Sequence, residues 1–172
     1  MEHSLFLCLA VTQLGMPRAD FACEMMDLVV QESAKYDVEP ELIISLIKRE
    51  SNWKKNLHHG FRNRYGGCGL MQVVPAFTGL KKTGTTKSTC RQLFDPKYNI
   101  QQGMMHFNFW LNKWAKGRTK QGLCSYLKGY TCKRRKMPKA GISYANSILR
   151  YSKKIKLTVK KILKEGSGCG TP

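Results

Sequence analysis

Acidic side chains are scarce over most of this chain. From Leu46 to the C-terminus the sequence has only Glu50, Asp95 and Glu165, whereas all but two of its 30 Lys and Arg residues lie in the same stretch. Residues 1–45 hold the rest of the 11 Asp and Glu residues, and the whole chain has a formal net charge of +19. This asymmetry predicts a polyanionic partner: nucleic acid, an anionic membrane surface or a cell-wall polymer.

Sequence signs of metal binding, membrane spans and repeats are also missing. The seven cysteines include no CxxC pair, and the four histidines show no paired spacing, so we expect no metal site and no cofactor. The chain has no internal repeat and no low-complexity linker. Its 172 residues fit one domain that can bury most of its apolar surface.

The longest N-terminal apolar run, Leu5 to Leu14, is too short to span a bilayer. It has about the length of a signal-peptide core, and small residues follow with candidate cleavage points after Ala19 or Ala22. We therefore predict a leader over residues 1–22 and export to the periplasm, the medium or a virion. No Lys or Arg precedes the run, so the alternative is an ordinary apolar helix that packs on the domain.

Cysteine usage agrees with export. Removing residues 1–22 leaves an even set of six cysteines, as expected in an oxidising compartment. Six cysteines allow 15 pairings, and the sequence alone does not choose among them. The interpretations we favour are a local Cys124–Cys132 bridge, a Cys68–Cys90 bridge that braces a glycine-rich segment, and a Cys23–Cys169 bridge that ties the ends.

Helical periodicity dominates the remaining sequence. It predicts helices over residues 23–36, 40–51, 75–80, 96–116, 119–128 and 142–163. Pro40 and Pro96 suit first helical turns, Asp95 suits an N-cap, and Gly166 is a stop signal. Residues 56–69 and 81–89 are polar and rich in glycine, lysine or threonine. We therefore predict a mostly α domain over residues 23–165 with a small irregular β or loop lobe, followed by a flexible tail over residues 166–172.

Glu50 occupies an unusual place in the second of these helices. It follows Ile43 by seven residues, Leu46 by four and Ile47 by three, which puts it on their apolar face. Partial desolvation raises the pKa of a carboxyl group and favours a proton-holding acid. The alternative is a glutamate at the helix end that turns to solvent or pairs with Lys or Arg.

Four ordered blocks carry a family resemblance. They are Glu50-Ser51, Gly69-Leu70-Met71-Gln72-Val73-Val74-Pro75, the segment 93–103 (LFDPKYNIQQG) and the segment 144–151 (YANSILRY). Together they span roughly residues 38–152 and resemble the soluble lytic transglycosylase (SLT) family of peptidoglycan-cleaving enzymes. The resemblance implies a goose-type-lysozyme-like fold and a peptidoglycan substrate.

The resemblance also implies roles for individual residues. Glu50 would be the catalytic acid and base, and Ser51 would orient its carboxyl group or the bound sugar. The cleft wall would be formed by Gly69, Leu70, Met71 and Gln72. Of these four, Met71 and Gln72 would contact saccharide.

The family's AYNAG-like segment aligns with Ser125-Tyr126-Leu127-Lys128-Gly129. Tyr126 keeps the tyrosine that lies beside the catalytic carboxylate. Leu127 and Lys128 replace the usual Asn and Ala. This departure puts in doubt the sugar contact that the Asn makes.

A shortage of carboxylates constrains the chemistry. Common glycosidases use two carboxylates, but Asp95 looks like a helix cap. The alternative is a second carboxylate supplied across the cleft by the acidic N-terminal segment, where Asp37 and Glu39 are the nearest in sequence. One carboxylate suffices if the sugar supplies its own nucleophile, as in the family's reaction, where the 6-hydroxyl of N-acetylmuramic acid (MurNAc) closes a 1,6-anhydro ring. The alternatives are a goose-type lysozyme that hydrolyses the same MurNAc–GlcNAc bond and a non-enzymatic cationic protein that binds wall or nucleic acid.

Aromatic and basic residues give weaker signals. Trp53, Trp110 and Trp114 could stack on sugar rings, although tryptophans at helical spacing are more often core, and Tyr65 and Phe77 could line a groove. Basic stripes run through residues 133–136 and along the face formed by Lys153, Lys154, Lys156, Lys160, Lys161 and Lys164. We expect them either to be solvated or to attract anionic wall polymers. We expect a monomer without a specific nucleic-acid partner, serving wall remodelling or a secretion, conjugation or phage apparatus.

Overall fold

The structure is a computed structural model that describes residues 2–59 and 66–167. Its α-helices are α1 (Glu2–Gln13), α2 (Ala19–Glu24), α3 (Met26–Lys35), α4 (Pro40–Ser51), α5 (Pro96–Asn108), α6 (Thr119–Lys128) and α7 (Lys139–Ser167). Shorter pieces are the 3-10 turns η1 (Pro75–Phe77), η2 (Gln92–Phe94) and η4 (Gly129–Thr131), and the π-helical η3 (Phe109–Trp114). In the described residues β pairing is limited to three isolated bridges, at His58–Cys68, Cys68–Val73 and Lys133–Lys136. The predicted mostly α domain with a small irregular lobe is confirmed.

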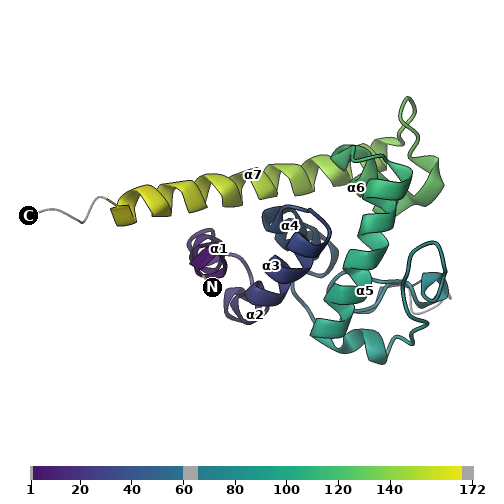
Figure 1. Cartoon of the computed structure of the whole chain (residues 1–172), viewed down its shortest axis with the longest axis horizontal. Helices are drawn as coiled ribbons and strands as arrows, with labels where there is room; N and C mark the ends of the chain where they lie inside the picture. Colours follow the sequence, from purple (N-terminus) through teal and green to yellow (C-terminus); the bar gives the residue numbers. More distant parts are fainter. Residues whose placement is uncertain (1, 60–65, 168–172) are drawn as a thin grey trace, which may run out of the picture.

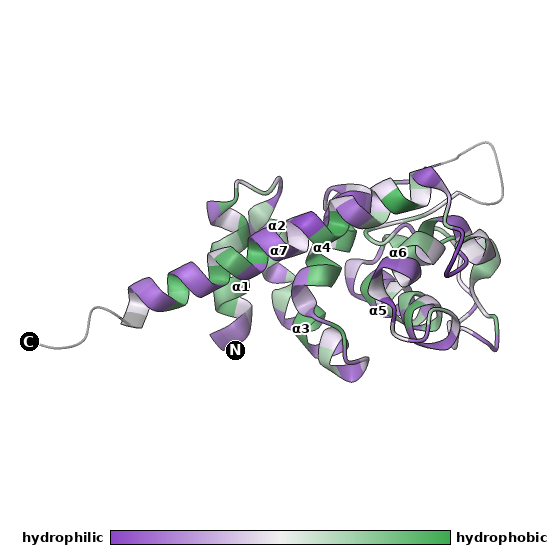
Figure 2. Ribbon diagram, turned by 90° about the horizontal axis from the view of Figure 1, so that it is seen from above, coloured by the Kyte–Doolittle hydropathy of each residue, from purple (hydrophilic) through white to green (hydrophobic). Residues whose placement is uncertain are grey.

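Helix α7 organises the arrangement. It runs across one side of the molecule and contacts α6, α4 and α1 in turn (Figure 1). Hydrophilic and hydrophobic residues alternate along it, as expected for a helix with one face on the core and the other in solvent (Figure 2). No helix in the described ranges combines the length and the apolar character that crossing a membrane requires.

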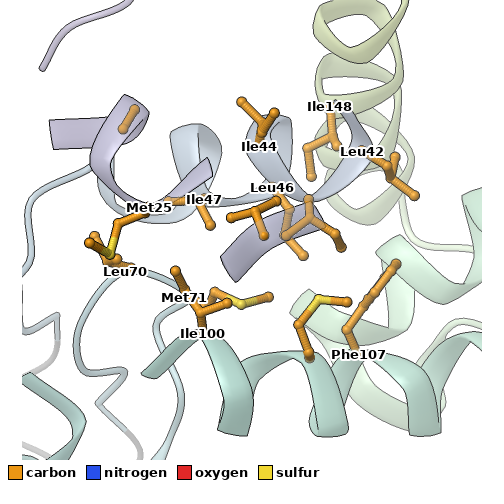
Figure 3. Close-up of a cluster of buried hydrophobic side chains, with 14 of the residues drawn as sticks. Met25, Leu42, Ile44, Leu46, Ile47, Leu70, Met71, Ile100, Phe107 and Ile148 are labelled. Carbon is orange, nitrogen blue, oxygen red and sulfur yellow. The ribbon is translucent and has the colours of Figure 1, made fainter. Parts of the chain in front are cut away.

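The hydrophobic core takes residues from α1, α3, α4, α5 and α7. Figure 3 shows Leu46 and Ile47 of α4 facing Met71, Ile100 and Phe107, and all five side chains are fully buried. Because α4 is enclosed by these neighbours over most of its length, its C-terminal end is held in a fixed place. That end carries Glu50.

Of the six predicted helices, α4, α6 and α7 are confirmed, two are interrupted and one is reduced to a single turn. Helices α4 and α6 have the predicted bounds, and Asp95 caps α5 by accepting a hydrogen bond from the Tyr98 amide at 2.7 Å. The helix predicted over residues 23–36 is split at Met25 into α2 and α3. The helix predicted over residues 96–116 changes to π-helix at Phe109. The helix predicted over residues 75–80 is the single turn η1.

The apolar N-terminal run forms α1, which packs on the domain. Leu7, Ala10 and Val11 are fully buried in the core, and a disulfide joins Cys8 to Cys23. The leader interpretation of residues 1–22 remains a prediction about processing. The packing is that of the alternative, an apolar helix that covers part of the core.

Three disulfides are present in the described residues. Cys68–Cys90 and Cys124–Cys132 match the predicted pairs. The Cys23–Cys169 pairing was wrong, because Cys23 is bonded to Cys8, a residue that the leader interpretation had removed from the count. Cys169 and most of the predicted tail lie outside the described residues, and Gly166 is still helical, so the stop signal expected there does not end α7.

Candidate active site

Glu50 is placed by the sequence of α4. Pro40 opens the helix, Ile43, Leu46 and Ile47 bury its apolar face, and Asn52 ends it in the left-handed conformation with its amide bonded to the Lys48 carbonyl. Glu50 therefore lies on the last turn, at the edge of the core. Its carboxyl group accepts a hydrogen bond from the hydroxyl of Tyr144, which α7 brings from 94 residues away.

The environment of Glu50 favours its protonated form. Burial raises the pKa of its carboxyl group from 4.5 to about 7, although the hydrogen bond from Tyr144 and the charge of Arg49 lower the pKa in part. Glu50 is not salt-bridged to a basic side chain in the described structure, so the alternative of a surface ion pair does not describe it. A group of this kind can hold a proton near neutral pH and release it to a substrate.

Glu50 lies in a groove made of connected hollows. One hollow of about 430 Å³ and another of about 480 Å³ both include Glu50, Arg49 and His59 in their walls, so the groove extends on both sides of the carboxyl group. The first hollow is further lined by Gly67, Gln72, Val74, Tyr126, Leu127 and Tyr144. Among the described residues that line these hollows, Glu50 is the only carboxylate.

The predicted cleft wall 69–72 is divided between the core and the groove. Gly69 has a φ of +74°, and a Cβ there would lie 2.2 Å from the Leu93 carbonyl oxygen, so only glycine fits. The side chains of Leu70 and Met71 are fully buried in the core behind the wall (Figure 3). Of these four residues, only Gln72 lines the hollow of Glu50, so the predicted contact of the Met71 side chain with saccharide does not fit its position in the core.

The buried side-chain amide of Asn99, on the first turn of α5, is hydrogen-bonded to this wall. Asn99 accepts a hydrogen bond from the Met71 amide at 2.7 Å and donates to the carbonyls of Cys68 at 2.8 Å and Leu93 at 2.7 Å. The Cys68–Cys90 disulfide adds a covalent link on the same segment. The hydrogen bonds of Asn99 and the disulfide both hold the segment that precedes Gln72, so the position of the wall depends on them.

Tyr126 lies beside Glu50 in the groove, as the resemblance implies. Its hydroxyl donates to the Met71 carbonyl at 2.7 Å, and its ring packs edge-on against Phe107 with centroids 5.8 Å apart. Burial, and the nearby charge of Glu50, raise the pKa of Tyr126 well above its usual value. The tyrosine is therefore a neutral, fixed part of the site.

The remaining candidates are Ser51, which lines the hollow of about 480 Å³ with Glu50, and the carboxylates of Asp95 and Glu39. The hydroxyl of Ser51 donates to the Ile47 carbonyl at 3.2 Å within α4, so its role in orienting the carboxyl group stays a prediction. Asp95 is the helix cap described above, and Glu39 pairs with Lys156. Neither of these two carboxylates lines a hollow that contains Glu50.

Sequence reasoning missed Tyr144 as a site residue. It begins the tyrosine-bounded segment 144–151, so a signal was present, but nothing in that segment indicates a bond to a glutamate on another helix. Arg49 was missed as well. It precedes Glu50 directly, and its guanidinium carbon lies 5.7 Å from the centre of the Tyr144 ring.

The tryptophans differ in their surroundings. Trp53 is fully buried and packs edge-on against Phe21 of α2, so it belongs to the core. Trp110 and Phe77 line a hollow that adjoins the one containing Glu50, and the Phe77 side chain is half exposed. Tyr65 lies outside the described residues. The basic side chains of residues 133–136 are exposed, as predicted.

One cluster has metal-like composition. His58, Cys68 and Cys90 have candidate ligand atoms within 4.8 Å of one another. The two sulfurs are joined in a disulfide, and a disulfide does not offer the thiolate ligands that a metal requires. Cys68 and Cys90 therefore form a structural disulfide on the segment that carries the groove wall.

Comparisons with known proteins agree with this geometry. The family model for the transglycosylase SLT domain matches residues 27–150. Among solved structures, the chain is similar to an inactive Glu-to-Gln mutant of the lytic transglycosylase Slt from Pseudomonas aeruginosa, with a TM-score of 0.63 and 15% sequence identity. That match covers 90% of this chain but only 30% of the Slt chain. No curated protein matches the sequence.

The likeness to Slt shows the lysozyme-like fold, and the family match spans well over half of the sequence, including Glu50, the wall 69–72, Tyr126 and Tyr144. The chain therefore belongs to the transglycosylase SLT domain family.

Proposed function

We propose that this protein is a peptidoglycan lytic transglycosylase that cleaves the β-1,4 bond between MurNAc and N-acetylglucosamine (GlcNAc) and leaves a 1,6-anhydro-MurNAc end. The observation that carries this proposal is a single carboxyl group, with a pKa raised to about 7, in a groove that extends on both sides of it. Family membership supports the same activity.

The chemistry uses Glu50 twice. In the first step the protonated carboxyl group gives its proton to the glycosidic oxygen, and the bond between that oxygen and C1 of MurNAc breaks. In the second step the carboxylate takes the proton of the sugar's own 6-hydroxyl, whose oxygen bonds to C1 and closes the anhydro ring. The carboxyl group ends protonated, so the cycle is balanced and needs no cofactor.

Tyr144 and Tyr126 support this cycle without changing charge. The Tyr144 hydroxyl stabilises the carboxylate that exists between the two steps, because it donates a hydrogen bond to it. Burial and Glu50 raise the pKa of Tyr144 well above its usual value, so Tyr144 keeps its proton. Tyr126 holds the wall through the Met71 carbonyl.

The distribution of carboxylates favours internal attack over hydrolysis. A hydrolase of the common kinds would need a second carboxylate to act as nucleophile or to activate water. Among the described residues of the groove there is no acidic side chain besides Glu50. Goose-type lysozyme activity on the same bond is therefore the second candidate.

Mass spectrometry of digested peptidoglycan tests the proposal. Anhydro ends lie about 18 Da, one water, below reducing ends, because attack is internal. We expect anhydro ends from the native protein and at least about 10²-fold slower turnover for Glu50→Gln, because acid catalysis is lost. Glu39→Gln makes the same chemical change outside the groove and should leave turnover unchanged. Reducing ends alone would refute the transglycosylase assignment, and normal turnover by Glu50→Gln would refute the role of Glu50.

The same variant separates the enzyme from a cationic binding protein. Glu50→Gln should still bind peptidoglycan while cleavage stops, whereas a non-enzymatic protein would show no cleavage in either form. We propose the glycan strands as the substrate, with anionic wall polymers attracted by the net charge of +19. Export to the periplasm, the medium or a virion, and service to a secretion, conjugation or phage apparatus, belong to the same proposal.

A further inference from the structure

Helix α7 has an outer side that faces away from the core. Its inner side carries Ile148, Ile155 and Val159, which are buried in the core. Leu157 comes two residues after Ile155 and two before Val159, which places it about 160° around the helix from both. Its side chain is 56% exposed. Leu157 therefore projects outward, on the side of α7 opposite to the core.

Basic side chains surround Leu157 on this outer side. The neighbours of a residue on a helix surface lie three, four and seven positions away along the chain. For Leu157 all six of these positions are basic and exposed: Arg150, Lys153, Lys154, Lys160, Lys161 and Lys164. The sequence of α7 has one acidic residue, Glu165, which pairs with Lys161 at 3.7 Å. Like charges at these spacings destabilise a helix, so folding does not account for the cluster.

A second basic element lies on the same side. Residues 133–136 (KRRK) form a tight turn that is closed by hydrogen bonds between the backbones of Lys133 and Lys136, at 3.0 and 3.2 Å. All four side chains are exposed. The turn projects beyond the start of α7, on the side away from α4 (Figure 1). The six residues around Leu157 and the four of this turn are called the basic face below.

Exposed acidic residues lie on the opposite side of the molecule. Glu24 of α2 and Asp27 of α3 are exposed, and both helices lie across the core from α7 (Figure 1). An extended negative surface would attract the basic face and repel the acidic side, so the molecule would meet it with α7 foremost. None of the basic-face residues lines a hollow that contains Glu50, so this contact does not occupy the groove.

Leu157 indicates which kind of negative surface fits. The phosphates of a nucleic acid or a wall polymer gain from the cations but gain nothing from an apolar side chain among them. A bilayer gains from both, because leucine enters the boundary between headgroups and acyl chains while Lys and Arg reach the lipid phosphates. Ile142 and Leu149 add apolar surface on the outer side, where they line a hollow of about 620 Å³ with Arg150 and Lys153.

We propose that the basic face is a docking surface for an anionic lipid bilayer, on which α7 lies flat with Leu157 in the interface. The 29 residues of α7 give a contact about 43 Å long. Each Lys or Arg close to an anionic bilayer strengthens binding by about fivefold, so the cluster gives an association that salt weakens. The inference goes beyond the proposed function, because it assigns a second binding surface that acts without cleavage.

Cosedimentation with lipid vesicles tests this surface. The probes are vesicles of phosphatidylcholine alone and vesicles of phosphatidylcholine mixed with phosphatidylglycerol, both at physiological salt. We expect the native protein and Glu50→Gln to bind the mixed vesicles and not the neutral ones. Absence of binding to the mixed vesicles would overturn the docking surface. The proposed function would still stand in that case if digested peptidoglycan carries anhydro ends.

Two triple variants separate the basic face from net charge. One combines Lys153→Gln, Lys160→Gln and Lys164→Gln on the basic face, and the control combines Lys81→Gln, Lys87→Gln and Lys97→Gln outside it. All six lysines are exposed, so both proteins should unfold as the native protein does. We expect the first triple to weaken vesicle binding by about 10²-fold and the control to weaken it much less. Equal losses would show that net charge is responsible, and the proposal would be wrong.

A pair of leucine variants separates a bilayer from a soluble polyanion. Leu157→Gln and Leu5→Gln make the same change at leucines that are 56% and 58% exposed. We expect Leu157→Gln to weaken binding to the mixed vesicles by about fivefold and to leave binding to duplex DNA unchanged, because only the bilayer takes up the leucine. Leu5→Gln should change neither. If Leu157→Gln binds the mixed vesicles as tightly as the native protein does, the face recognises charge alone and the bilayer proposal fails.

Discussion

Replacing Glu50 by Gln should stabilise the folded protein at alkaline pH and not at acidic pH. The reason is the buried position of the carboxyl group, which makes ionisation harder in the folded than in the unfolded chain. Gln has nearly the same shape and its side-chain carbonyl can accept the hydrogen bond from Tyr144. The substitution therefore removes the charge while it keeps most of the contacts.

The magnitude follows from the pKa of Glu50. Its rise from 4.5 to about 7 corresponds to about 3 kcal/mol between the two protonation states. Because the folded pKa is the higher one, the folded state binds more protons between these values, and stability falls as pH rises from about 4.5 to about 7. The carboxyl group is partly open to the groove, so we expect about 2 kcal/mol to be measured.

Denaturant unfolding at a series of pH values measures this effect. The free energy of unfolding of Glu50→Gln minus that of the native protein should be constant below about pH 4 and about 2 kcal/mol larger above about pH 8. Other titrating groups are present in both proteins and largely cancel in the difference. A difference that does not change with pH, or one that shrinks as pH rises, would show that the pKa of Glu50 is not raised.

Two further predictions concern the groove wall. Asn99→Ala removes the partner of the buried Met71 amide and of the Leu93 carbonyl, while the Cys68 carbonyl still accepts from the Val73 amide at 3.1 Å. The free energy of unfolding should therefore fall by at least about 2 kcal/mol. Asn112→Ala, at an exposed asparagine, should change it by less than about 0.5 kcal/mol. Gly103→Ala would place a Cβ 2.6 Å from Cβ of Met71. It should therefore lower the free energy of unfolding by about 1–3 kcal/mol, and it should lower kcat/KM because the wall is displaced. Unchanged unfolding and kinetics would contradict the packing described.

The helices that the sequence predicted best, α4 and α6, have a clear apolar period, although neither has a side-chain cap. Pro40 and the isoleucine–leucine pattern defined α4 to the residue, and the position of Glu50 on its buried side followed. The four ordered blocks then indicated the fold through the family resemblance, and one of them contains a residue that the fold needs for a local reason, Gly69 at a positive φ. Local signals of this kind can be recognised without knowing the neighbours.

The features that sequence analysis missed depend on distant partners. Nothing near Tyr144 in the sequence shows that it donates to Glu50. A methionine taken by itself is more often a core residue, and it was the family block that placed Met71 in the cleft, although its side chain is buried in the core. The split at Met25 also lacks a proline or glycine to mark it. The Cys8–Cys23 bridge was missed for another reason, since treating residues 1–22 as a leader removed one partner beforehand.

Helix α1 and the second half of α7 pack together outside the region that the family model matches. The family match ends at residue 150 and begins at residue 27, yet Leu7 and Val11 share one buried cluster with Ile155 and Val159. The stretch that the family match covers is thus shorter than the stretch whose residues share this buried cluster. A fragment limited to residues 27–150 would expose to water the apolar side chains that α1 and the second half of α7 cover.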